Sequence, residues 1–268
     1  MFYKIIEKIK FNYKVSFNFG LNFFYKIKFF LSLFLISISK KIVPKINYSI
    51  KLILRNDKSV FSFYLSDISD LGAFTEIFIN KEYEVNLSKD PGIIFDLGSN
   101  SGLSVIYFKL KYPNSKIFAF EPNPFAFEKL KKNTAQFSDV FYYNVAISDL
   151  DGSDKFYVCD VDSLSSSFVK RKTKGHYLEV KTRSIGSLIK ELGLDRIDLM
   201  KFDVEGAEFK IFNNDFPFDL FDSMIGEVHL DLIDFNIDKQ EFLSKFKQFY
   251  NVNIFDISNK RFVLKIEK

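Results

Sequence analysis

The chain of 268 residues contains one cysteine, no tryptophan and two histidines. Because Cys159 has no partner in the chain, an internal disulfide and any multi-cysteine zinc module are excluded. A lone cysteine also favours a reducing compartment, so we expect a cytoplasmic protein. The uncharged run at residues 29–39 has eleven residues, whereas a membrane-spanning helix needs about 20. Since this run starts late and no small-residue cleavage site follows it, a signal peptide is not expected either.

Acidic residues are scarce in the first part of the chain. Residues 1–58 carry twelve Lys or Arg and two acidic residues, whereas residues 59–268 carry 26 basic and 32 acidic residues. The net charges are therefore +10 and −6. We predict a basic, aromatic-rich helical N-terminal extension at 1–58 and one main domain at 59–268. An asymmetry of this kind indicates an anionic surface, either membrane or nucleic acid, as the partner of the extension.

Residues 1–14 place apolar side chains at helical spacing with lysines between them. A basic amphipathic helix of this type can lie in a bilayer interface. We therefore expect residues 1–41 to make peripheral contact with an anionic membrane. The alternative is a helical extension that packs on the main domain or on a second subunit, and Pro44 is expected to end the helical stretch.

The main domain alternates between strand and helix patterns. Such an alternation predicts an α/β fold with a doubly wound sheet. The expected strands are residues 93–95, 116–120, 140–145, 197–202 and 224–230, followed by an antiparallel hairpin of 250–257 and 261–267. The expected helices follow Gly102, Asn123, Ser184 and Asp238, each of the last three serving as an N-cap.

A glycine-rich segment follows the first of these strands, with the pattern Asp96-x-Gly98-x-Asn100-x-Gly102. Its glycines allow a tight turn and let the backbone approach a ligand. The segment lacks the G-x-G-x-x-G spacing that seats a pyrophosphate on a helix N-terminus. Asp96 would repel phosphates and suits a ligand that carries an ammonium group.

An acidic residue, Glu121, ends the second strand. A carboxylate there accepts hydrogen bonds from ribose hydroxyls, and ligands bind beyond the carboxyl ends of such strands. A nucleoside with an amino-acid tail and no phosphate is S-adenosylmethionine, which we predict as the cofactor. Ser99, Pro122 and Asn123 lie in the same two segments and complete the predicted site. The alternative is that Asp96 and Glu121 only cap helix N-termini.

Three blocks of sequence resemble the FkbM family of S-adenosylmethionine-dependent methyltransferases: IIFDLGSNSG (93–102), IFAFEPNP (117–124) and IDLMKFDVEGAE (197–208). The segment TEIFINKEYE (75–84) resembles the lead-in to the first strand. The resemblance covers about residues 60–268 and implies a Rossmann-like class I methyltransferase fold of seven strands, the last antiparallel. It also implies O-methylation, often of sugars in surface glycans or of secondary metabolites.

The third block supplies candidates for the acceptor side. Asp203 ends the fourth strand, at the edge of the cofactor site where class I enzymes face the acceptor, so we assign it to both catalysis and cofactor binding. Lys201 leaves the same face of that strand. Glu205 follows Asp203 in the sequence. His229 is a further candidate, because the ordinary pKa of histidine suits a general base near neutral pH. Alternatively, Asp203 and Glu205 cap the next helix, Lys201 pairs with Asp203, and His229 is an ordinary core histidine. A divalent metal on Asp203, Glu227 and His229 is chemically allowed, but no ligand spacing compels it and we expect none.

Two further segments are assigned to the site. Ser148, which follows the third strand, is expected to meet the adenine ring, with Asp149 as its neighbour. The polar stretch 160–174 reads as a loop that shapes the acceptor pocket, or as a solvated linker.

The resulting prediction is an O-methyltransferase that acts on a hydroxyl of a saccharide or glycolipid. A nucleic-acid methyltransferase is the first alternative. Amine-methylating enzymes of that class usually carry an Asn/Asp-Pro-Pro-aromatic motif after the fourth strand, where this chain has Asp203-Val-Glu-Gly. The second alternative is a membrane-associated binding module without turnover.

Overall fold

The computed structural model describes all residues except 1, 43–48, 67, 160–174, 233–237 and 259. The chain divides into two compact units, Met1–Ile79 and Asn80–Lys268. Each unit is described by itself. Among the helices of the described residues, none combines the length and the apolar character needed to cross a bilayer.

The first unit contains helices and a β-hairpin. Its elements are α1 (Phe2–Phe19), α2 (Phe23–Ile42), β1 (Ile50–Asn56), β2 (Ser59–Leu65), α3 (Ile68–Phe74) and the π-helix η1 (Thr75–Ile79). The predicted helices are thus present, and they are followed by two strands that the sequence patterns did not indicate. The β1–β2 hairpin turns between the paired residues Asn56 and Ser59. The predicted domain boundary, between residues 58 and 59, therefore falls inside this hairpin. The unit itself continues to Ile79.

Aromatic side chains form much of the interior of this unit. Phe74 stacks on Phe78 with ring centroids 4.9 Å apart, and Phe78 stacks on Phe61 at 5.4 Å. Phe19 and Phe29 meet Phe74 edge-on. These rings join α1, α2, β2 and α3–η1 into one core, because aromatic pairs in offset or edge-to-face geometry add to the free energy of burial.

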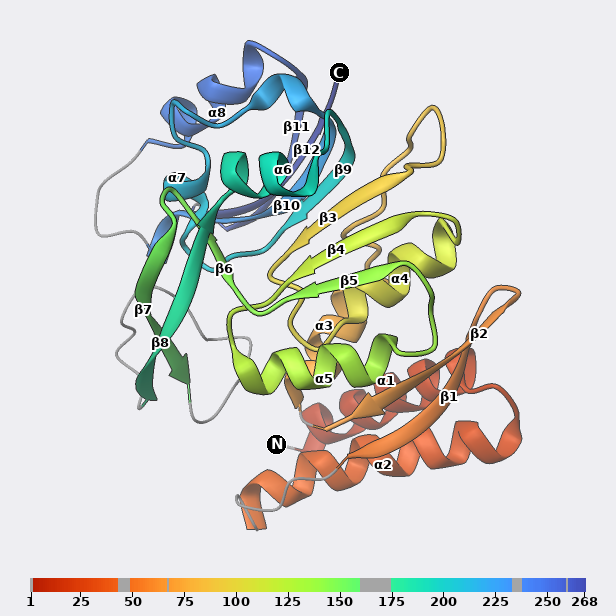
Figure 1. Cartoon of the computed structure of the whole chain (residues 1–268). Coiled ribbons are helices and arrows are strands. Elements are labelled where there is room, and N and C mark those ends of the chain that lie inside the picture. Colours follow the sequence, from red (N-terminus) through yellow and green to blue (C-terminus); the bar gives the residue numbers. More distant parts are fainter. Residues whose placement is uncertain (1, 43–48, 67, 160–174, 233–237, 259) are drawn as a thin grey trace. The chain divides into compact units, whose positions relative to one another are not determined.

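The second unit is built on a seven-stranded sheet (Figure 1). In spatial order its strands are β11 (Asn251–Ser258), β12 (Arg261–Glu267), β10 (Phe221–His229), β9 (Ile197–Phe202), β3 (Ile93–Leu97), β4 (Lys116–Phe120) and β5 (Val140–Tyr143). The last strand, β12, is antiparallel to both of its neighbours, and β10, β9, β3, β4 and β5 are parallel. This is the class I methyltransferase arrangement that the sequence predicted, including the antiparallel hairpin at the end.

Four predicted strands differ from the observed ones at their ends. The strand predicted at 93–95 continues to Leu97, and the one predicted at 250–257 is observed at Asn251–Ser258. The strand predicted at 140–145 ends at Tyr143, and the one predicted at 224–230 begins at Phe221 and ends at His229. The strand at 197–202 is confirmed to the residue.

Helices cover both faces of this sheet. They are α4 (Leu103–Lys111), α5 (Pro124–Thr134), α6 (Ile185–Leu192), α7 (Glu208–Ile211), α8 (Lys239–Lys247) and the 3₁₀ turns η3 (Phe218–Leu220) and η4 (Leu230–Leu232). Phe95 of β3 shares an apolar core with Leu188 of α6 and Phe242 of α8. Asp96, the next residue of β3, points to the other face and binds Ser104 of α4. The doubly wound prediction is therefore confirmed.

A second sheet of three strands was not predicted. It consists of β6 (Ala146–Ser148), β8 (Gly175–Ser184) and β7 (Gly152–Cys159), with β7 antiparallel and β6 parallel to β8. The predicted pocket loop at 160–174 joins β7 to β8 and lies outside the described residues.

Candidate active site

The glycine-rich segment forms a tight turn between β3 and α4. Gly98, Asn100 and Gly102 all have positive φ, at 74°, 45° and 88°. A Cβ on Gly98 would lie 2.0 Å from the carbonyl oxygen of Asp203, so only glycine fits there. The backbone N–H of Asp203 also donates to the carbonyl of Leu97 at 3.0 Å. The turn after β3 and the end of β9 are thus in direct backbone contact.

Glu121 ties this turn to the end of β4. Its carboxylate accepts the backbone N–H of Asn100 at 2.8 Å and that of Asn123 at 2.8 Å. Burial raises the pKa of Glu121 to about 7, against the lowering effect of those two hydrogen bonds and of Lys201. A carboxylate has about four acceptor positions, so the two backbone bonds leave capacity for ligand hydroxyls.

Asp96 and Lys201 form a buried pair in the middle of the sheet. The register of β3 and β9 places them opposite each other, and Lys201 Nζ lies 3.2 Å from Asp96 Oδ1. Lys201 also donates to the carbonyl of Gly98 at 2.8 Å, while Ser104 Oγ donates to Asp96 Oδ2 at 2.5 Å. Lys201 therefore pairs with Asp96 and not with Asp203, and it anchors the glycine turn.

Three more predicted residues make local contacts around the turn. Ser99 Oγ donates to the carbonyl of Asp96 at 2.9 Å. Asn123 is the N-cap of α5, and its side chain accepts an N–H of the first turn at 3.0 Å. The carbonyl of Pro122 accepts from Asn144 Nδ2 at 3.1 Å. These contacts fix the backbone of the two segments that were predicted to meet the cofactor.

Ser148 ends β6 and is almost completely buried. Its hydroxyl donates to Asp149 Oδ1 at 2.9 Å. The two residues assigned to the adenine side thus contact each other, and their role toward the ring stays a prediction.

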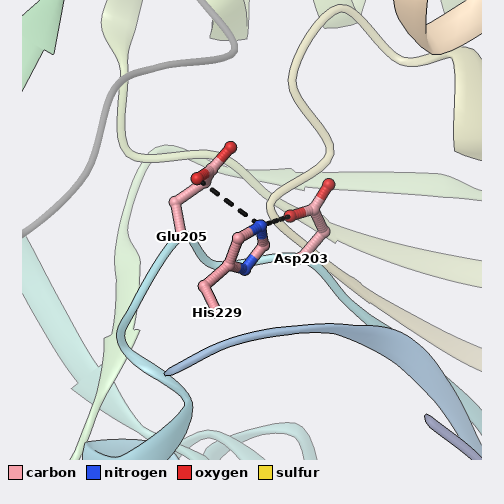
Figure 2. A group of neighbouring side chains, drawn as sticks. All are labelled: Asp203, Glu205 and His229. Atoms are coloured by element: carbon pink, nitrogen blue, oxygen red, sulfur yellow. Dashed lines mark ion pairs between the residues drawn. The ribbon is translucent and has the colours of Figure 1, made fainter. Parts of the chain in front are cut away.

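Acidic side chains surround His229 at the end of β10. Nδ1 lies 2.9 Å from Glu208 Oε1, and Nε2 lies 3.4 Å from Glu227 Oε1 and 3.6 Å from Glu205 Oε2. Asp203 Oδ1 is 4.0 Å from Nε2. Figure 2 shows the imidazole directed between Asp203 and Glu205. The structure thus brings together three of the four residues predicted for the acceptor side, while Lys201 lies under the glycine turn.

The protonation of His229 follows from these neighbours. Burial lowers its pKa, but the hydrogen bond and charge of Glu208 and the charges of Glu205 and Asp203 raise it to about 10. An imidazole with that pKa holds its proton at neutral pH. The surroundings therefore do not favour the predicted base role of His229, which stays a prediction.

The sequence patterns missed Tyr83, and they placed Glu208 after the fourth strand, three residues beyond Glu205, without giving it a role. The Tyr83 hydroxyl donates to Asp203 Oδ2 at 3.3 Å, and Lys201 Nζ lies 5.3 Å from the centre of the Tyr83 ring. Burial, and then the charge of Asp203, raise the pKa of Tyr83 well above its ordinary value. Both residues lie in segments that carry the family resemblance, and that was the available signal.

A family model, described as the methyltransferase FkbM domain, matches residues 96–250. That stretch covers more than half of the chain and contains the glycine turn, Glu121 and the cluster at His229. The chain belongs to the FkbM methyltransferase family. The resemblance in the three sequence blocks is thereby confirmed.

Three relatives are similar to this FkbM chain. "Methyltransferase 1" of Beauveria bassiana is 29% identical over 66% of this chain and 81% of its own length. The 2-O-methyltransferase NoeI of Sinorhizobium fredii is 32% identical over 46% of this chain and 56% of its own. The hexuronic acid methyltransferase AglP of Haloferax volcanii is 26% identical over 46% and 50%.

The fold and the family together establish the class of enzyme. This FkbM chain is a methyltransferase, and S-adenosylmethionine is its cofactor. The identity of the acceptor is a separate question, because one fold serves many substrates.

Proposed function

We propose that this enzyme is an O-methyltransferase that methylates a hydroxyl group of a saccharide or glycolipid in surface-glycan biosynthesis. The observation that carries the proposal is the position of Asp203. Its backbone contacts the glycine turn directly, and its carboxylate lies at the carboxyl end of β9, where an acceptor meets the cofactor. The names of two relatives support the proposal: one specifies 2-O-methylation, which supports an oxygen acceptor, and the other names a hexuronic acid, which supports a sugar.

The residues present suit S-adenosylmethionine. We assign the ribose hydroxyls to Glu121, whose carboxylate is fixed by two backbone N–H groups and retains acceptor positions. The turn from Gly98 to Gly102 offers backbone without side chains at its two ends. Asp96 acts on this turn through Lys201, because both of its oxygens lie against partners inside the protein.

S-adenosylmethionine would supply a methyl group bonded to a positively charged sulfur, and its transfer to a hydroxyl oxygen would release a neutral thioether. Asp203 would orient the acceptor hydroxyl toward that methyl group. The hydroxyl proton passes to the Asp203 carboxylate and from there to water. Tyr83 holds the other oxygen of that carboxylate.

The acceptor class is tested with the full chain and cofactor that carries a labelled methyl group. One arm contains oligosaccharides and glycolipid, and the other contains total RNA. We expect label in the saccharide arm that survives mild alkali, because methyl ethers resist alkali and methyl esters do not. Label in RNA, or label released by alkali, would overturn the proposed acceptor. Cofactor binding without transfer in either arm would favour a module without turnover.

We also propose that residues 1–41 contact an anionic membrane. One face of α2 exposes apolar side chains at helical spacing: Phe23, Phe24, Ile27, Leu31, Phe34 and Leu35. Phe29 and Leu33, on its other face, are buried. An exposed apolar stripe in a segment with net charge +10 is typical of helices that lie in the interface of an anionic bilayer.

A further inference from the structure

Acidic side chains and one imidazole form the cluster at His229. Four carboxylates lie within 4.0 Å of the two imidazole nitrogens. Divalent metal ions bind clusters of carboxylates and imidazole.

The donor atoms converge on one point. One carboxylate oxygen each of Asp203 and Glu205 and a ring nitrogen of His229 all lie within 4.8 Å of one another. We propose that Asp203, Glu205 and His229 bind a divalent metal ion through these three atoms. Figure 2 shows the three side chains approaching the same point, Asp203 and Glu205 from the segment after β9 and His229 from the end of β10.

The environment of His229 suits a metal ligand. Its side chain is 1% exposed, and Nδ1 is held by Glu208, whose own side chain is fully buried. Histidines that bind metals commonly donate their other N–H to a carboxylate, which fixes the tautomer and directs the free nitrogen at the ion. The contact with Glu208 therefore directs Nε2 between the carboxylates. A metal ion bound there would displace the proton that Nε2 carries in its absence.

Asp203 supplies a second, independent observation. Its Oδ1 is buried and has no hydrogen-bond donor among the residues that the structure describes, whereas Oδ2 accepts from Tyr83. A buried carboxylate oxygen without a donor is costly, because it loses its hydration without replacement. Since this oxygen lies on the side of His229 Nε2, a cation between the two would satisfy it.

The turn that carries Glu205 has an unusual backbone conformation. Its φ of 51° lies in the left-handed region, which is unfavourable for a residue with a Cβ, and Gly206 follows at 100°. Strained residues of this kind persist where the surrounding structure holds them, and they gather at functional sites. The strained turn carries the Glu205 carboxylate back toward His229.

The donor set indicates the class of metal. Two carboxylates suit hard cations, and an imidazole suits first-row transition metals. A mixed set of this type favours Mn²⁺ or a neighbouring divalent ion. The binding of the ion does not depend on the proposed function, but its use does. An ion on Asp203 Oδ1 would polarise the acceptor oxygen, and the second acceptor position of that carboxylate oxygen would remain for the hydroxyl proton.

The test measures binding of Mn²⁺ to the full chain without cofactor or acceptor, by the loss of the free-ion paramagnetic resonance signal. We expect one saturable site, with affinity at least 10-fold weaker in Glu205→Gln and in His229→Gln. Glu128→Gln is the matched control, because Glu128 is exposed on α5 and should leave the affinity unchanged. Circular dichroism and cofactor titration of each variant show whether it has folded.

No saturable site in the wild-type chain would overturn the metal proposal, as would equal affinity in a folded Glu205→Gln. The two proposals fail separately. If the chain transfers methyl to a saccharide in the presence of a chelator and does not bind Mn²⁺, the metal proposal is overturned and the proposed function is supported. If Glu205→Gln abolishes Mn²⁺ binding and the wild-type chain transfers no methyl to saccharide, the metal proposal is supported and the proposed acceptor is overturned.

Discussion

Asp96 and Lys201 face each other on neighbouring strands, with Nζ 3.2 Å from Oδ1 and both side chains at most 2% exposed. Neither side chain reaches solvent, yet Lys201 also binds the carbonyl of Gly98. The pair therefore links the centre of the sheet to the turn that we assign to the cofactor.

Breaking this pair should be costly. In Lys201→Met the Asp96 carboxylate stays buried without its cation, and removal of one partner of such a pair costs about 3–5 kcal/mol. We expect the free energy of unfolding, measured by urea denaturation, to fall by that order. The double variant Asp96→Asn/Lys201→Met should recover part of the loss. If the double variant loses as much as the sum of the single variants, the two side chains do not act as a pair.

The turn at Gly98 should tolerate no side chain. In Gly98→Ala the new Cβ meets the carbonyl of Asp203, and φ is positive. We expect a loss of at least about 2 kcal/mol in stability and weaker cofactor binding by calorimetry. The matched control is Gly186→Ala in α6, where a Cβ meets nothing within 4 Å. Since alanine is the better helix former, the control should gain up to about 1 kcal/mol.

Glu121 should make stability depend on pH. Its pKa is raised from 4.5 to about 7 in the folded chain, so the folded state binds the proton more tightly than the unfolded state. The contribution of Glu121 is therefore fully present below pH 4.5 and is lost as pH rises through 7. Relative to Glu121→Gln, wild type should lose on the order of 2–3 kcal/mol between about pH 5 and pH 8.

Denaturation of both proteins at several pH values checks this difference. Cofactor titration at pH 8 then separates stability from binding, because Glu121→Gln removes a charged acceptor and should still bind more weakly. A stability difference that is constant across the range would show that Glu121 has an ordinary pKa.

The exposed face of α2 should determine membrane binding. Leu31→Ser/Leu35→Ser removes two apolar side chains that are 51% and 56% exposed. We expect at least 10-fold weaker co-sedimentation with vesicles of phosphatidylglycerol, since each buried leucine contributes about 1.5–3 kcal/mol. Leu150→Ser is the control, because Leu150 is 71% exposed in the second unit.

Two results would contradict the proposal that this face of α2 binds an anionic membrane. Wild-type chain could bind vesicles of phosphatidylcholine as tightly as anionic ones, which would remove the charge argument. Alternatively, the double variant could bind as wild type does while light scattering shows a dimer turning into a monomer. The stripe would then be the contact between two copies of the chain.

Local signals made much of this fold predictable. The helix at Ile185–Leu192 has its N-cap at Ser184 and its left-handed C-cap at Gly193, as the sequence indicates. The strand at 197–202 is a short apolar run that ends at an acidic residue. The strand β8 carries polar and charged residues at most positions, and β7 begins with Gly-Ser-Asp-Lys, so no regular apolar alternation marks either strand.

The contacts of the site were less predictable, because they depend on strand register and burial. Alternation along β9 suggested that Lys201 pairs with Asp203, but the register between β3 and β9 places Asp96 opposite Lys201. That register is set by packing between segments about a hundred residues apart. The burial of Tyr83 and Glu208 has the same origin, so their roles emerge only from the folded chain.

We propose that the Asp203 carboxylate acts on the acceptor hydroxyl and not on the cofactor. Methyl transfer to a saccharide acceptor by Asp203→Asn, with cofactor affinity measured on the same sample, tests this role most directly. We predict turnover at least about 100-fold lower, with the dissociation constant of S-adenosylmethionine within about 3-fold of wild type, a shift of less than 1 kcal/mol. Transfer at the normal rate would contradict the role of Asp203.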